Sequence, residues 1–269
     1  MHLLPCLLMF LLASDTKPAN SDQLQQGFND MYNLSFPSAH QAFESWEKAH
    51  PENPEGPVFD AAAYLFSEFD RLKILQSEFF LSDRSYAELK RVTPSPEVKL
   101  KFEQALAQSR RLSEKRLQQA PKDESALFAN VLGLGLQADY LALIQKQDLA
   151  ALREIKQATQ GAEELLKMYP DCYDAYIAVG IENYLLSLKP APIRWLLHAG
   201  GAQTDRQTGI EKLKLTAAKG QYLKPYAELL LAVAALREKD NAGARRLLAD
   251  LSSRFPQNAL YREELKKIP

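Results

Sequence analysis

Few residues in this sequence have the types and spacing that catalysis or metal binding requires. None of the four histidines has a second ligand at the spacing of a metal site; they are His2, His40, His50 and His198. Cys172 has neither a basic neighbour nor a histidine close in sequence, so we expect a structural thiol rather than a nucleophile. Carboxylate pairs such as Glu163 and Glu164 are typical of a solvated helix face. We therefore predict a protein that is not an enzyme and binds neither a metal nor a cofactor.

One glycine pair could be taken for a phosphate-binding loop. Gly200 and Gly201 precede an expected helix, and a helix N-terminus can hold an anion. However, no P-loop lysine follows the glycines, and Asp205 would repel a phosphate. We interpret the glycines as a turn, and Thr204 with Gln207 as the capping box of the next helix.

The composition is that of an ordinary globular protein with one or two domains. Hydrophobic residues make up 46% of the 269 residues and charged residues 25%. The 33 Lys and Arg against 34 Asp and Glu leave a formal net charge of -1, which argues against nucleic-acid binding. With only 11 Gly and 15 Pro, collagen-like and disordered classes are excluded.

The N-terminus carries an apolar run over residues 3–13 that is too short to span a bilayer and fits the core of a signal peptide. We expect cleavage after Ala13 or Ala19, and an exported, periplasmic or secreted protein of a bacterial envelope. The run lacks the usual preceding Lys or Arg. Two alternatives to cleavage therefore remain. The segment is retained and forms the only membrane contact of the protein, or it is an apolar turn that packs on the domain. The predicted boundaries are 1–20 for this segment and 21–269 for one helical domain.

Beyond residue 20, apolar residues recur at helical spacing between prolines, glycines and polar turns, which indicates an all-α chain. Gly133 and Gly135 fall inside one of these helices, where we interpret both as contacts for a neighbouring helix. The expected helices are 21–33, 37–50, 56–80, 96–120, 123–145, 147–169, 171–188, 191–199, 204–219, 222–238, 241–255 and 258–267.

Several of these helices share one internal spacing, in which a small residue is followed by apolar residues four and seven positions later and by proline twelve positions later. The three full copies are Ala39, Phe43, Trp46 and Pro51; Ala158, Ala162, Leu165 and Pro170; and Ala244, Leu248, Leu251 and Pro256. Partial copies contain Gly209, Leu213 and Thr216, and, more weakly, Ser109 and Ser113. Positions four and three apart share a helix face, and the small residue lets a neighbouring helix approach. The pattern resembles the second helix of a tetratricopeptide repeat (TPR).

This resemblance covers about residues 21–260 as four to five repeats. It implies an all-α, right-handed α-solenoid of antiparallel helix pairs, with irregular insertions at 73–96 and 185–204. In a TPR superhelix the first helices line the concave face, at fixed positions around a leading residue, here Ala129, Tyr176 and Tyr226. The candidate binding residues are Asn130, Ile177, Ile181, Tyr184, Lys224 and Leu231, together with Trp195 on a short inserted helix.

The implied concave face is chiefly apolar, which argues against a clamp for peptide carboxylates. An inserted segment around 193–197 or 79–81 would fill the groove, or the groove would hold an apolar helix or a lipid-like ligand. We expect a scaffold that binds a protein or peptide partner; the alternative is a carrier for an apolar small molecule. The last expected helix, 258–267, is polar on one side and would cap the solenoid, which favours a monomer.

Overall fold

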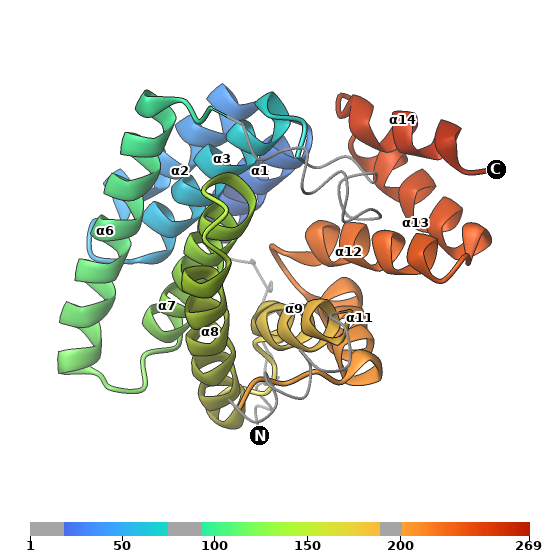
Figure 1. The fold of residues 1–269 in the computed structure, drawn as a ribbon. Coiled ribbons are helices and arrows are strands. Elements are labelled where there is room, and N and C mark those ends of the chain that lie inside the picture. Colours follow the sequence, from blue (N-terminus) through green and yellow to red (C-terminus); the bar gives the residue numbers. More distant parts are fainter. Residues whose placement is uncertain (1–18, 75–92, 189–200) are drawn as a thin grey trace, which may run out of the picture.

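The computed structural model describes residues 19–74, 93–188 and 201–269, with side chains from residue 23 onward (Figure 1). These residues form no strand, and the prediction of an all-α chain is confirmed. The α-helices are α1 (Ala19–Tyr32), α2 (Phe36–Ala49), α3 (Glu55–Arg71), α6 (Pro96–Gln119), α7 (Glu124–Asp139), α8 (Asp148–Met168), α9 (Tyr176–Ser187), α11 (Arg206–Lys219), α12 (Lys224–Arg237), α13 (Asn241–Arg254) and α14 (Ala259–Lys267). A π-helical turn, η2 (Tyr140–Ile144), extends α7, and a 3-10 turn, η3 (Tyr173–Ala175), precedes α9.

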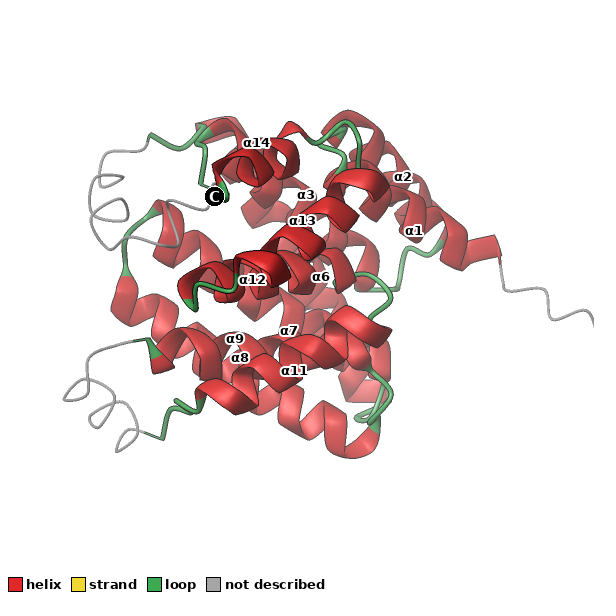
Figure 2. Cartoon of the chain, turned by 90° about the vertical axis from the view of Figure 1, so that its right-hand side faces the viewer, coloured by secondary structure: helices red, strands yellow, loops and turns green. Residues whose placement is uncertain are grey.

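Consecutive helices pack against one another along the whole described chain. Five pairs are formed by α1 with α2, α3 with α6, α7 with α8, α9 with α11, and α12 with α13. The second helix of each pair also contacts the next first helix, and α14 packs on α13 (Figure 2). The architecture is therefore solenoid-like, and it is compatible with a helical repeat.

The second helices bury the residues that the sequence pattern singles out. The buried residues of α2, α8, α11 and α13 include Ala39, Phe43 and Trp46; Ala158, Ala162 and Leu165; Gly209, Leu213 and Thr216; and Ala244, Leu248 and Leu251. These positions share one face of each helix, and burial of that face stabilises the stack. The predicted packing stripe is confirmed in all four helices.

Two hydroxyl groups in this stripe are satisfied by backbone carbonyls of the same pair. In α6, Ser109 Oγ donates to the carbonyl oxygen of Pro54 over 2.9 Å, just before α3. In α11, Thr216 Oγ1 donates to the carbonyl oxygen of Tyr173 over 2.8 Å, just before α9. Each bond ties a second helix to the start of its own first helix, and it removes the cost of burying a hydroxyl without a partner.

Most first helices end in the same way. A residue with positive φ, between 57° and 63°, follows α1, α3, η2 and α12; these residues are Leu34, Lys73, Lys146 and Lys239. After α12, the N–H of Asp240 donates to the carbonyl oxygen of Ala235 over 2.9 Å, which closes a Schellman-type turn. None of the four is the glycine that this backbone conformation favours.

The structure corrects three local predictions. The helix predicted over 123–145 finishes as the π-helical turn η2 rather than as a continuous α-helix. The N-cap of α11 is Asp205, whose carboxylate accepts from the N–H of Thr208 over 2.6 Å, so Thr204 is not the cap. A methyl group built at Gly135 would meet no atom of the described residues within 4 Å, so this glycine does not admit a neighbouring helix; Gly133 lies beside Leu106 and Val58.

Other predictions fall on parts of the chain outside the described residues. These are the N-terminal apolar run, the helix at 191–199 with Trp195, and the candidate filling segments at 79–81 and 193–197. The helix predicted over 56–80 is described as far as residue 74, and α3 within it ends at Arg71.

Candidate functional site

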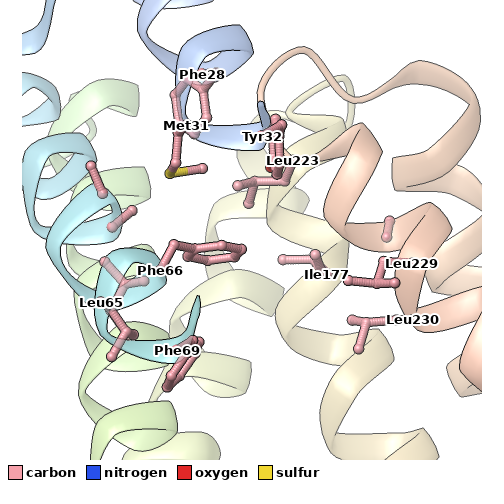
Figure 3. Close-up of a cluster of buried hydrophobic side chains, with 14 of the residues drawn as sticks. Phe28, Met31, Tyr32, Leu65, Phe66, Phe69, Ile177, Leu223, Leu229 and Leu230 are labelled. Carbon is pink, nitrogen blue, oxygen red and sulfur yellow. The ribbon is translucent and has the colours of Figure 1, made fainter. Parts of the chain in front are cut away.

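The first helices point buried apolar side chains toward one central region. Figure 3 shows Met31 from α1, Phe66 from α3, Ile177 from α9 and Leu229 from α12 directed toward it. Phe66, Ile177 and Leu229 are each 7% exposed, and all belong to one hydrophobic cluster. We call Phe66, Asp139, Ile177, Tyr226 and Leu229 the concave centre, because these residues come from four different first helices.

The polar group of the concave centre is the carboxyl of Asp139, the last residue of α7. Tyr226 Oη, on α12, donates to Asp139 Oδ2 over 3.5 Å, which is a long hydrogen bond. The ring of Tyr226 meets that of Phe66 edge to face, with centroids 5.3 Å apart. Within the described part of the chain, the Tyr226 hydroxyl is the only polar partner of this carboxyl.

Burial controls the protonation of both groups. It raises the pKa of the Asp139 carboxyl to about 7, because the ionised form is poorly solvated there. Burial, and then the neighbouring Asp139 charge, raise the pKa of Tyr226 well above its usual value, so the phenol stays neutral. Asp139 retains some exposed surface. Near neutral pH it therefore presents a carboxyl that is close to half ionised.

Two local features leave room near this carboxyl. Gly135 precedes Asp139 by four residues, so both lie on one face of α7, and Gly135 borders open space among the described residues. On the α14 side of Tyr226, a hollow of about 280 Å³, open solvent included, is lined by Met31, Phe66, Tyr226, Leu229 and neighbouring residues, and Asp139 is not among its lining residues. This hollow as described holds about one water molecule, so a larger ligand requires side-chain movement.

The sequence-predicted site residues fall into three groups. Ile177, Tyr184 and Leu231 are buried, at 7%, 2% and 9% exposure, and pack in the same core cluster. Ile181 is half-buried and packs against that cluster. Asn130 on α7 and Lys224 at the start of α12 are also half-buried and keep polar surface. Trp195 lies outside the described residues.

Asp139 and Phe66 were not among the predicted site residues, although the sequence holds a signal for Asp139. It is the only charged residue between Glu124 and Lys146. The stretch Glu124–Ile144 is long and apolar enough to cross a membrane by length and composition, and half of it is buried inside the protein. A buried core helix meets the same criterion. A lone acid in such a helix is a candidate functional group.

A second group of ionisable residues lies where α2 meets α3. The Asp60 carboxylate and His40 Nδ1 are 2.5 Å apart, and the imidazole lies 4.0 Å from the Tyr64 ring centroid. Nearby on α2, burial and then the charge of Asp60 raise the pKa of Glu47 to about 7. The His40 and Asp60 side chains bond to each other, and they join α2 of the first pair to α3 of the second.

Two further observations bear on chemistry. The described residues contain no group of three or more His, Cys, Asp or Glu side chains placed to hold a metal ion. Burial raises the pKa of the Cys172 thiol to about 12, so the sulfur is protonated and weakly nucleophilic.

Comparison with protein-family models, with curated proteins and with solved structures finds no match.

Proposed function

We propose that this protein is a non-enzymatic TPR-like scaffold of a bacterial envelope that binds a protein or peptide partner. The observation that carries the proposal is a row of half-buried residues along the first helix α7. Leu127, Asn130, Leu134 and Gln137 are spaced three and four residues apart, and each keeps exposed surface. Such a row suits the apolar face of a partner helix or peptide, with two amides to fix its register.

The test is site-specific photo-crosslinking in the native envelope. A crosslinker at Leu134 should capture one discrete partner, because Leu134 lies on the proposed binding row. The matched control is Leu149 at the start of α8, which is 77% exposed and lies off that row. Purified partner should then bind the unmodified protein and lose affinity for the Leu134→Asp variant. Equal capture at both positions, or unchanged affinity of the variant, would contradict the proposal.

A second candidate function is a carrier for an apolar small molecule. The concave centre favours it, because Asp139 bonds Tyr226 next to the Phe66 ring, and Gly135, one turn earlier on α7, borders open space among the described residues. Native mass spectrometry of protein purified from its own envelope fraction tests this function. A retained adduct of lipid size supports the carrier, and a bare protein supports the scaffold.

The same spectrum tests two subordinate proposals, export with N-terminal processing and a monomeric state. The monomer is supported by α14, where the exposed residues after Ala259 are Arg262, Glu263, Lys266 and Lys267, all of them charged. A charged outer face disfavours the stacking of a second chain on the last pair. An unprocessed mass or a dimer would contradict the respective proposal.

A further inference from the structure

We propose that the concave centre selects a small molecule with an apolar body and a cationic ammonium group, which pairs with Asp139. This inference rests on the second candidate function, the carrier, and it names the ligand class of that same site.

The negative charge of Asp139 favours a cationic ligand. Asp139 closes an apolar helix, and within the described residues its only polar partner is the neutral hydroxyl of Tyr226, 3.5 Å away. A poorly solvated carboxylate is unfavourable without a counter-ion. The described residues place no cationic side chain against Asp139, and a ligand ammonium would supply the opposite charge. A ligand headed by a carboxylate or a phosphate would instead place two negative charges together.

A pair of aromatic rings adjoins this carboxyl through Tyr226. Tyr226, which holds Asp139, meets Phe66 edge to face at 5.3 Å and an interplanar angle of 77°. Two rings at this angle leave faces that point in different directions. The negative face of an aromatic ring attracts an ammonium group, most strongly where water is excluded. The carboxyl and the ring that could contact the cation therefore lie side by side.

The apolar body of such a ligand needs room beside Asp139. Among the described residues, Gly135 borders open space on the face of α7 that carries Asp139, and Leu134 beside it is partly exposed. On the other side of the site, the side chains of Ile177 and Leu229 are apolar but buried, each 7% exposed, so a ligand contacts them only after side chains move. The raised pKa of Asp139 fits the same interpretation, because a bound ammonium would favour the ionised carboxyl and release a proton.

The experiment compares three ligands that share one alkyl chain: decyltrimethylammonium, decanol and decanoate. Binding is measured by isothermal titration calorimetry below the micellar concentration, at about pH 8, where Asp139 is mostly ionised. We expect the ammonium ligand to bind at least about tenfold more tightly than decanoate. Asp139→Asn should lower the affinity for the ammonium ligand by about tenfold and leave the affinity for decanol unchanged.

The matched control is Asp250→Asn on α13, which removes the same charge from an exposed position beside Arg254. It should leave the affinities of all three ligands unchanged. Gly135→Leu, which fills the open space, should lower the affinities for all three ligands. Circular dichroism shows whether this variant is folded.

The outcomes separate this inference from the function on which it rests. If none of the three ligands binds, the carrier function is wrong and the inference falls with it. If decanoate binds as tightly as the ammonium ligand, the carrier stands and the charge selectivity is wrong. An ammonium affinity that is equal in the wild-type protein and in Asp139→Asn would also overturn the inference, because the cation would then bind elsewhere.

Discussion

The side-chain amide of Asn258 donates to the backbone carbonyl oxygen of Tyr32 over 2.9 Å, a contact between residues 226 positions apart. Tyr32 Oη in turn donates to the carbonyl oxygen of Tyr222 over 3.0 Å, and Ser35 Oγ donates to Gln257 Oε1 over 2.8 Å. The end of α1 is therefore bonded both to the turn before α12 and to the turn before α14. These contacts join the first pair of the stack to the last.

We predict that Asn258→Ala lowers the free energy of unfolding by about 2–3 kcal/mol. The substitution removes the buried bond to Tyr32 and also the N-cap of α14, where Asn258 Oδ1 accepts from the N–H of Leu260. Asp240→Ala removes only an N-cap, that of α13, and should cost about 1 kcal/mol. Urea unfolding measures both. Equal losses would show that the contact between α1 and Asn258 contributes nothing.

A second prediction concerns the positive-φ residue after α12. Lys239→Gly should raise the free energy of unfolding by about 0.5–1 kcal/mol, because glycine adopts φ 61° without the steric cost that a side chain adds. Lys214→Gly, at an exposed position inside α11, should lower it by about 1 kcal/mol. Thermal unfolding distinguishes the two. A loss of stability in Lys239→Gly would contradict the conformational argument.

The glycines of α7 and α11 should respond to alanine in opposite directions. A Cβ at Gly209 would lie 2.5 Å from the backbone nitrogen of Tyr184, so Gly209→Ala must separate α11 from α9 and should cost about 2–4 kcal/mol. Gly135→Ala meets no atom of the described residues within 4 Å and should gain up to about 1 kcal/mol from helix propensity. Denaturant unfolding measures the free energy of unfolding of both variants. Changes of the same sign and size in the two would contradict the prediction.

The raised pKa of Asp139 predicts a pH dependence of stability. In the folded protein this carboxyl holds its proton up to about pH 7, against an ordinary value of 3.8. Between about pH 4 and pH 7 the folded state therefore binds more protons than the unfolded state. The contribution of Asp139 to stability falls as the pH rises through this range. Asp139→Asn should therefore be more stable than the wild type at pH 8, by a margin about 1–2 kcal/mol larger than at pH 5.

Urea unfolding of both proteins at the two pH values checks this difference. The comparison isolates Asp139, because other carboxyls, such as Glu47 with its pKa of about 7, affect both proteins equally. A margin that does not change with pH would show that the Asp139 carboxyl is solvated in the folded protein.

The helices and their packing faces could be predicted because local residues carry that information. Ala39, Phe43 and Trp46 share one face of α2 whatever the rest of the chain does, and all three are buried. The last turn of α7 could not be predicted in the same way, because periodicity does not distinguish a π-helical turn from an α-helical one.

The candidate site was only partly predictable. The repeat pattern identified the first helices and therefore Ile177 and Ile181, but it could not say that Ile177 is buried while Ile181 keeps exposed surface. The sequence marks Asp139 as a lone charge in an apolar stretch. That its partner is the Tyr226 hydroxyl depends on a contact across 87 residues.

The sequence by itself thus determined the all-α class, most helix boundaries and the buried stripe of the second helices, because these follow from neighbours within one or two helical turns. The tertiary structure alone decided that Asn258 meets Tyr32 and that Asp139 faces Tyr226. Both contacts depend on how distant helix pairs are placed relative to one another along the stack. Local sequence patterns do not contain that information, so the concave centre can be identified only in the folded chain.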